Sequence, residues 1–364
     1  MENEAFSLYA KTPSEITQLL GLEKPFQGRQ IYQWLVKGAS SFDEMTNLPK
    51  ALRERLSSDH PSLFSSKLMT SQSDPDGAAK LALELHDGNI IECVLLTDRE
   101  GELTACVSSQ AGCAMGCRFC RTGTLKLKRN LQAFEIVEQF MHLQKVAPGK
   151  IGHVVFMGMG EPLANLDNVV HAISFLHDPE GLNLSHRRIT ISTCGLVPGI
   201  NELARRRVPV KLAVSLVTAD DETRSDLMPV NRAFPLKVLR DALERFQKVS
   251  GRRFTFEYCM IHDKNISDRD ADKLARFCRG LEVIVNLIPF NPCPELPFET
   301  PSDAEIRQFT NALTSRGVEY TIRISRGRSI KGACGQLAGK LEENRWDGRQ
   351  SSQSNAINVA LSRE

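Results

Sequence analysis

Residues 104–120 read TACVSSQAGCAMGCRFC, a strand-like run followed by a loop with three cysteines in a CxxxCxxC spacing. Further strand-like runs follow, separated by amphipathic stretches, and this alternation is typical of a parallel sheet covered by helices. Six such units predict an α/β fold with a partial (βα)6 barrel, and a seventh run at 320–324 can extend or flank it. The other five runs are HVVFMG (153–158), RITIST (188–193), VKLAVSL (210–216), RFTFEYCMI (253–261) and EVIVNLIPF (282–290).

The chain before the barrel reads as short helices. Residues 1–65 predict a small helical N-terminal domain, with helix N-caps at Thr12 and Ser41 and a break at Gly28. Tyr32 and Trp34 in this region fit either the core of the small domain or a surface that contacts a partner.

Three further boundaries follow from patterning. Residues 66–98 predict a β-hairpin connector, because KLALELHDGNIIECVLLT (80–97) alternates apolar and polar residues around Asp87-Gly88-Asn89. The barrel and a C-terminal cysteine loop are expected over 99–341. The polar residues 342–364 are expected to form a mobile tail.

Length and composition limit the class of protein. The 364 residues are 41% apolar, enough to bury a sizeable core. Apolar runs such as 281–290 are shorter than a membrane span, and no basic segment followed by an apolar one begins the chain, so we expect a cytoplasmic protein without membrane contact. Ten cysteines in that compartment indicate metal binding or thiol chemistry rather than structural disulfides.

The net charge of +2 hides an uneven distribution of basic residues. Two segments, 103–134 and 320–341, contain no acidic residue. Such segments are often ordinary solvated faces, but beside reactive cysteines they favour a polyanionic partner. Their basic residues are Arg118, Arg121, Lys126, Lys128 and Arg129 in the first, and Arg323, Arg326, Arg328, Lys331 and Lys340 in the second.

The cysteine loop predicts an iron–sulfur centre. Cys113, Cys117 and Cys120 can bind three irons of a [4Fe–4S] cluster and leave the fourth iron without a protein ligand. Structural zinc normally takes four protein ligands, and the loop has no fourth His or Cys at zinc-like spacing, although Cys106 is not far away. A zinc-stabilised RNA-binding module without catalysis is the alternative from another class.

The CxxxCxxC loop, with Phe119 just before its last cysteine, resembles the signature of the radical S-adenosylmethionine (SAM) superfamily. The resemblance implies that SAM binds the open iron and that its reductive cleavage yields a 5′-deoxyadenosyl radical. MGMGEP, at 157–162, is similar to the superfamily's Gly-Gly-Glu strand end. Gly158 and Gly160 permit close approach of the backbone, and Glu161 offers a carboxylate to an ammonium group.

Similarity to one family, the RlmN/Cfr adenine methyltransferases, extends over almost the whole chain. The stretches that carry it are KPFQGRQIYQWL (24–35), SFDEMTNLPK (41–50), CVSSQAGCAMGCRFCRTG (106–123), MGMGEPLANLDNV (157–169), VNLIPFN (285–291) and GACGQLAG (332–339).

This resemblance implies roles for individual residues. Cys334 corresponds to the methyl carrier, Cys106 to the resolving thiol and Glu92 to a proton acceptor. At position 217 the family usually has His, whereas this chain has Val217, which puts a side-chain contact there in doubt. The remaining cysteines are expected to pack in the interior. The implied SAM contacts are Gly160, Glu161, Ser192, Ser215, Leu216, Val217 and Asn291, and the packing cysteines are Cys93, Cys194, Cys259, Cys278 and Cys293.

The resemblance also implies a reaction that uses two SAM molecules per turnover. One methylates Cys334; the second supplies a radical that converts the S-methyl group into a methylene radical, which adds to an adenine carbon. Cys106 then releases the base by forming a disulfide with Cys334. The implied substrates are adenosines of 23S rRNA and tRNA modified at C2, with C8 as the alternative position, and the implied reductant is a low-potential donor such as flavodoxin.

Overall fold

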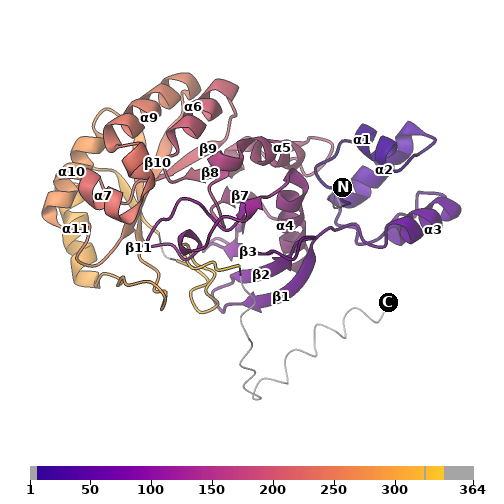
Figure 1. Cartoon of the computed structure of the whole chain (residues 1–364), viewed down its shortest axis with the longest axis horizontal. Helices are drawn as coiled ribbons and strands as arrows, with labels where there is room; N and C mark the ends of the chain where they lie inside the picture. Colours follow the sequence, from indigo (N-terminus) through magenta and orange to yellow (C-terminus); the bar gives the residue numbers. More distant parts are fainter. Residues whose placement is uncertain (1–5, 324, 340–364) are drawn as a thin grey trace, which may run out of the picture.

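A ten-stranded sheet forms the centre of the protein (Figure 1). The computed structural model describes residues 6–323 and 325–339, so the tail expected from 342 lies outside the described residues. The strands lie side by side in the order β1 (Lys67–Ser73), β2 (Ala79–Glu84), β3 (Ile90–Thr97), β4 (Leu103–Cys106), β7 (His153–Phe156), β8 (Ile189–Thr193), β9 (Lys211–Ser215), β10 (Phe254–Met260), β11 (Val283–Pro289) and β12 (Tyr320–Ile322).

From β4 to β12 every neighbouring pair of strands is parallel, as the six predicted units require. The seventh run extends the sheet as β12. Within the described ranges, no helix has both the length and the apolar character needed to cross a membrane. The crossover helices are α4 (Ala133–Val146), α5 (Leu166–His177), α6 (Val197–Arg206), α7 (Asp221–Leu227), α8 (Val230–Ala233), α9 (Leu236–Ser250), α10 (Asp268–Cys278) and α11 (Asp303–Ser315).

The predicted hairpin is present as β2 and β3, with a tight turn in which Gly88 N donates to Leu85 O at 2.9 Å. It is continuous with the barrel sheet, because β3 pairs antiparallel with β4. A third antiparallel strand, β1, was not predicted, since KLMTSQS is mostly polar and largely exposed. The barrel sheet therefore carries a three-stranded antiparallel extension at its β4 edge.

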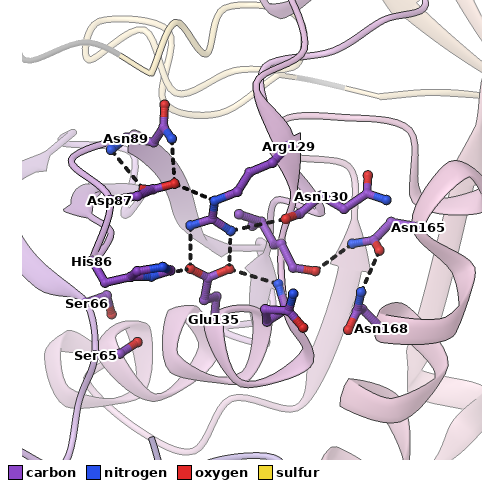
Figure 2. Close-up of polar contacts among 12 residues, drawn as sticks. Ser65, Ser66, His86, Asp87, Asn89, Arg129, Asn130, Glu135, Asn165 and Asn168 are labelled. Atoms are coloured by element: carbon purple, nitrogen blue, oxygen red, sulfur yellow. Dashed lines mark hydrogen bonds and ion pairs between the residues drawn. The ribbon is translucent and has the colours of Figure 1, made fainter. Parts of the chain in front are cut away.

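Arg129 ties the hairpin turn to the barrel (Figure 2). Its guanidinium donates to both oxygens of Glu135 at 2.7 Å and also to Asp87 in the turn. Glu135 lies in the first turn of α4 and is fully buried, and His86 lies 3.4 Å from it. One arginine of the acid-free segment is thus occupied by structural carboxylates rather than left for a ligand.

The N-terminal region is helical, as predicted: α1 (Pro13–Leu19), α2 (Pro25–Val36), a 3-10 turn η1 (Phe42–Glu44) and α3 (Lys50–Asp59). Thr12 caps α1 and Ser41 precedes η1, as expected. Tyr32 belongs to the core: it is buried, its ring packs edge-on against Phe175 of α5, and its hydroxyl donates to Asp178 at 2.5 Å. These contacts fix the helical domain against the barrel.

A buried carboxylate, Glu138 of α4, fastens the link between the two parts. It accepts from Ser7 Oγ at 2.8 Å, Ser65 N at 2.8 Å and Ser66 N at 2.9 Å. Burial raises the pKa of Glu138, and these donors act in the opposite direction. The segments on both sides of the helical domain are thereby held to one side chain of the barrel.

The predicted break at Gly28 is wrong, because Gly28 lies inside α2. A Cβ there would lie 2.1 Å from Thr17 Oγ1 and 2.3 Å from Pro13 O, so glycine is needed where α1 crosses α2.

Gly28→Ala should lower the free energy of unfolding of this domain by about 1–3 kcal/mol through overpacking, measured by hydrogen exchange of α1 and α2. Gly149→Ala, whose Cβ would meet Leu103 Cδ1 at 3.8 Å, is the control. Equal exchange in both variants would contradict the packing argument.

Candidate active site

The cysteine loop follows β4 and is closed by a short ladder of β5 (Gln110–Ala111) and β6 (Arg129–Asn130). Gly112 allows this closure: its φ is +79°, and a Cβ would lie 2.2 Å from Lys126 O. The loop brings Cys113, Cys117 and Cys120 to the wall of one cavity of about 180 Å³, called here the cluster cavity. Cys117 is buried, and the other two are half-buried.

The cluster cavity lies where the strands of the barrel end. Ser192 comes from the end of β8, Ser215 from the end of β9, and Asn291 from the residues after β11. Because the C-terminal ends of parallel barrel strands converge, residues distant in sequence meet there. Of the seven predicted SAM contacts, Leu216 alone does not line the cavity; its side chain is fully buried in the core.

Glu161 lies in the segment after β7, directly before the 3-10 turn η3 (Pro162–Asn165), and both of its oxygens accept hydrogen bonds from backbone amides. Its Oε1 accepts from Leu163 N at 3.0 Å and its Oε2 from Cys194 N at 2.8 Å. Burial raises the pKa of Glu161, while these backbone donors favour the carboxylate. Gly160, with φ of +101°, lets the chain pass over Gln110, where a Cβ would meet Gln110 N at 2.8 Å.

Val217 adopts a left-handed backbone conformation, with φ of +65°. This conformation is unfavourable for a β-branched residue and easier for histidine, the residue that the family resemblance leads us to expect there. Asn265 stabilises it, because Asn265 Nδ2 donates to Val217 O at 2.7 Å. Val217 lines the cluster cavity despite lacking a polar side chain.

A second cavity, of about 460 Å³, adjoins the first and is called here the thiol cavity. It is lined by Cys106 and Cys334, the two cysteines predicted outside the cluster, and by Arg323. Cys334 lines both cavities, and so does Cys120 of the cysteine loop. The other residues shared by the two linings are Thr122, Met157, Gly158, Ile288 and Gly335. The exposed Cys334 therefore lies between the three-cysteine loop and the second reactive thiol.

The electrostatics of the thiol cavity favour a protonated Cys106. Burial raises its pKa to about 12, the nearby Cys334 acts in the same direction, and the Arg323 guanidinium acts against both. In the part of the chain that the structure describes, Arg323 forms no salt bridge, and its Nη1 lies 3.8 Å from Met157 Sδ. Arg323 also interacts electrostatically with the buried Glu257, and its guanidinium can stabilise negative charge on Cys106.

Cys334 is held through its backbone. Asn291 Nδ2 donates to Cys334 O at 3.0 Å, and Arg121 N donates to Gly335 O at 2.7 Å. Arg121 follows the last cluster cysteine directly, so the cluster loop and the Cys334 segment are in contact. The position of the thiol depends on both.

Glu92 lies in β3, behind the Cys334 segment, and lines neither cavity. Its Oε1 lies 3.0 Å from Lys80 Nζ, and its Oε2 accepts from Ala338 N at 2.6 Å and from Gly339 N at 2.8 Å. Both oxygens of the predicted proton acceptor are therefore already occupied.

All ten cysteines are described and all are unpaired. Of the five expected to pack in the interior, Cys93, Cys194 and Cys293 are buried, and Cys259 and Cys278 are half-buried against the core. Cys194 and Cys259 also line the cluster cavity. Both cysteines lie at or near the C-terminal end of a barrel strand, a position that indicates a place at the site. Their apolar neighbours in the sequence instead suggest packing in the core.

Known proteins share both the sequence and the fold. The Radical SAM superfamily model matches residues 107–277, and the model of the ribosomal RNA large subunit methyltransferase N-terminal domain matches 17–60. A probable dual-specificity RNA methyltransferase RlmN of Treponema denticola is 49% identical over 89% of this chain and 93% of its own length. The chain belongs to the RlmN family. An Anaeromyxobacter dehalogenans relative, the dual-specificity RNA methyltransferase RlmN, is 44% identical over 87% of each chain.

A solved structure agrees with this family membership. The crystal structure of a radical SAM methyltransferase from Sphaerobacter thermophilus superposes with a TM-score of 0.87 at 42% identity, covering 92% of this chain and all of that one. The predicted α/β radical SAM barrel is confirmed.

Arg224 of α7 is a residue of this RlmN-family site that patterning did not reveal. It is fully buried and donates to Cys194 O at 2.7 Å, Ser215 O at 3.2 Å and Leu216 O at 3.1 Å. The guanidinium thus joins the ends of β8 and β9 beneath the cluster cavity. A lone arginine in DETRSDL has no sequence signature that distinguishes it from a surface residue.

Replacing Arg224 should disturb the cavity floor. Because one ammonium cannot reach acceptors that a planar guanidinium spans, Arg224→Lys should cost about 3 kcal/mol of unfolding free energy and weaken SAM binding. Chemical denaturation and equilibrium dialysis of the holoenzyme measure the two effects. Arg232→Lys, at an exposed position, is the control. Unchanged stability of Arg224→Lys would refute this role.

Proposed function

We propose that this protein methylates C2 of adenosine in 23S rRNA and tRNA, using Cys334 as a covalent methyl carrier. The observation that carries the proposal is the position of Cys334 on the wall between the two cavities, facing the three-cysteine loop on one side and Cys106 on the other. Names of relatives at 44–49% identity support an RNA substrate.

The cluster cavity fits the cofactors of the family. Three thiols from one loop suit a [4Fe–4S] cluster with an open iron, and the hydroxyls of Ser192 and Ser215 and the amide of Asn291 suit the polar groups of SAM. When bound, this pair supplies the methyl group and the hydrogen-abstracting radical. Glu161, with its two oxygens fixed by backbone amides, is our proposed contact for the SAM ammonium.

The two cysteines of the thiol cavity carry out different steps of the reaction on RNA. Cys334 Sγ takes the methyl group as a thiolate, and after loss of a hydrogen atom the methyl carbon bonds to adenine C2. The adduct then loses one electron, which the bound cluster would accept, and its C2 proton, which Cys106 accepts. The Cys106 sulfur attacks Cys334 Sγ; the S–C bond breaks, its electron pair and the proton pass to the methylene carbon, and a Cys106–Cys334 disulfide and the methylated base remain. Arg323 favours the thiolate that Cys106 needs, against the effect of burial.

An adenosine must leave its helical stack to reach these thiols. Lys126 and Lys128 are exposed on the rim of the cysteine loop and suit phosphate contacts, and we assign the helical domain of residues 1–65 an accessory RNA-binding role. A flavodoxin-like donor in the cytoplasm would supply electrons.

The product of anaerobic turnover tests the function. Holoenzyme with SAM, a reductant and either a 23S rRNA fragment or tRNA should yield 2-methyladenosine, identified by nucleoside mass spectrometry against 2-methyl and 8-methyl standards. The 8-methyl product would correct the position of methylation. Absence of both products from protein with a full complement of iron would overturn the proposal.

Substitution of the two thiols should separate the steps. Cys106→Ala should still form the carbon–carbon bond but not release it, so RNA should accumulate covalently bound to protein on a denaturing gel. Cys334→Ala should form neither product nor adduct, and the double variant should resemble it. Wild-type turnover by Cys106→Ala without trapped RNA would show that another group resolves the intermediate.

A further inference from the structure

The segment that carries Cys334, residues 325–339, is called here the carrier loop (Figure 1, yellow). Its first half is fixed to the β1–β2 turn, where Gly327 N donates to Asp76 Oδ2 at 2.7 Å and Ser329 N donates to Asp74 Oδ2 at 3.1 Å. Its second half passes over β3, where the amides of Ala338 and Gly339 both point to Glu92. The antiparallel extension thus holds the loop at both ends.

Glu92 is poorly placed for exchange of protons with a substrate. Only 1% of the surface of Glu92 is exposed. Its ion-pair partner Lys80, on the neighbouring strand β2, has 4% of its surface exposed. A proton acceptor must come within hydrogen-bonding distance of the proton that it removes. Glu92 lines neither cavity, and its oxygens already accept from one ammonium and two backbone amides.

The same contacts suit Glu92 for holding a backbone in place. Charge-assisted hydrogen bonds are stronger than neutral ones, and a carboxylate at the backbone of a loop selects one arrangement of its amides. A buried ion pair contributes little net stability compared with apolar residues of equal volume, so its clearest value is to specify a position. Here the position specified is that of the chain four residues after Cys334.

We propose that Glu92 is a positioning residue: paired with Lys80, it clamps the C-terminal end of the carrier loop and thereby sets Cys334 between the two cavities. The proposal rests on the carrier role of Cys334 in the proposed function. It assigns Lys80 to the same device and gives Glu92 a role other than the proton acceptor that the family resemblance implies. Proton removal from the adduct then belongs to the groups that line the thiol cavity.

The two roles of Glu92 respond differently to a neutral pair at positions 80 and 92. Glu92→Gln alone keeps an oxygen for the loop amides but turns its NH2 group toward the Lys80 ammonium. Both groups are hydrogen-bond donors, so they repel each other. Lys80→Met/Glu92→Gln removes that conflict and keeps the acceptor for Ala338 and Gly339. A clamp is restored in this double variant, whereas a carboxylate base is lost in it.

Hydrogen exchange of the reconstituted holoenzyme reads the clamp directly, because the amides of Ala338 and Gly339 are its donors. In Glu92→Ala, the peptide that covers 333–339 should exchange about tenfold faster than in the wild type, since two charge-assisted bonds are lost. Lys80→Met should accelerate it in the same direction. Lys80→Met/Glu92→Gln should return to within about threefold of the wild type. Lys273→Met, which removes an ion pair with Asp220 far from the loop, should leave the peptide unchanged.

Methylation of Cys334 and RNA trapping complete the test. The clamp predicts that Glu92→Ala carries less methyl on Cys334 and traps no RNA, and that the double variant recovers methylation and turnover. Normal exchange in Glu92→Ala would overturn the proposal. A protected but inactive double variant that accumulates RNA adduct would overturn it too, because the carboxylate would then be the base. If Glu92→Ala does not fold, the double variant alone decides between these outcomes. Since hydrogen exchange needs no RNA, failure of the clamp is distinguishable from failure of the methyltransferase function.

Discussion

The antiparallel pairing of β3 with β4 joins the two halves of the reactive site. Through it, Cys106 at the end of β4 lies opposite Val94 of β3, and Glu92 of the same strand lies beneath the carrier loop. Without this pairing the barrel would keep its cysteine loop and the contacts of Asn291 and Arg121 with the Cys334 segment, but it would lack the carboxylate beneath the end of that segment. This short pairing, four residues from each strand, thus connects Cys106 with the segment that carries Cys334, although the two thiols lie far apart in the sequence.

Several buried charges near the site are satisfied by the backbone rather than by opposite charges. Arg224 donates to three carbonyl oxygens, and Glu161 accepts from two amides. Such groups are costly to bury unless their hydrogen bonds are complete. Because these partners belong to strand ends and turns, each charge fixes the local course of the chain around the cluster cavity.

The sequence predicted most of the framework, because strands buried on both faces form continuous apolar runs and the cysteine spacing is specific. The six barrel units and the hairpin were found on this basis. Strand β1 is not predictable in this way, because a polar, exposed edge strand lacks an apolar pattern. Gly28 resembles a helix break in the sequence, but the need for glycine there arises from contact with another helix. Glu92 accepts a hydrogen bond from a residue 246 positions away in the sequence, and Arg224 donates to residues up to 30 positions away. No local sequence pattern can reveal such contacts.

Cys194 and Cys259 give the cluster cavity a property beyond methyl transfer. With the three cysteines of the loop and Cys334, they surround it with six thiols. Thiolates are the preferred protein ligands of soft metal ions such as Cu(I) and of zinc. Soft metal ions that reach the cavity before iron would therefore compete with it for these thiols.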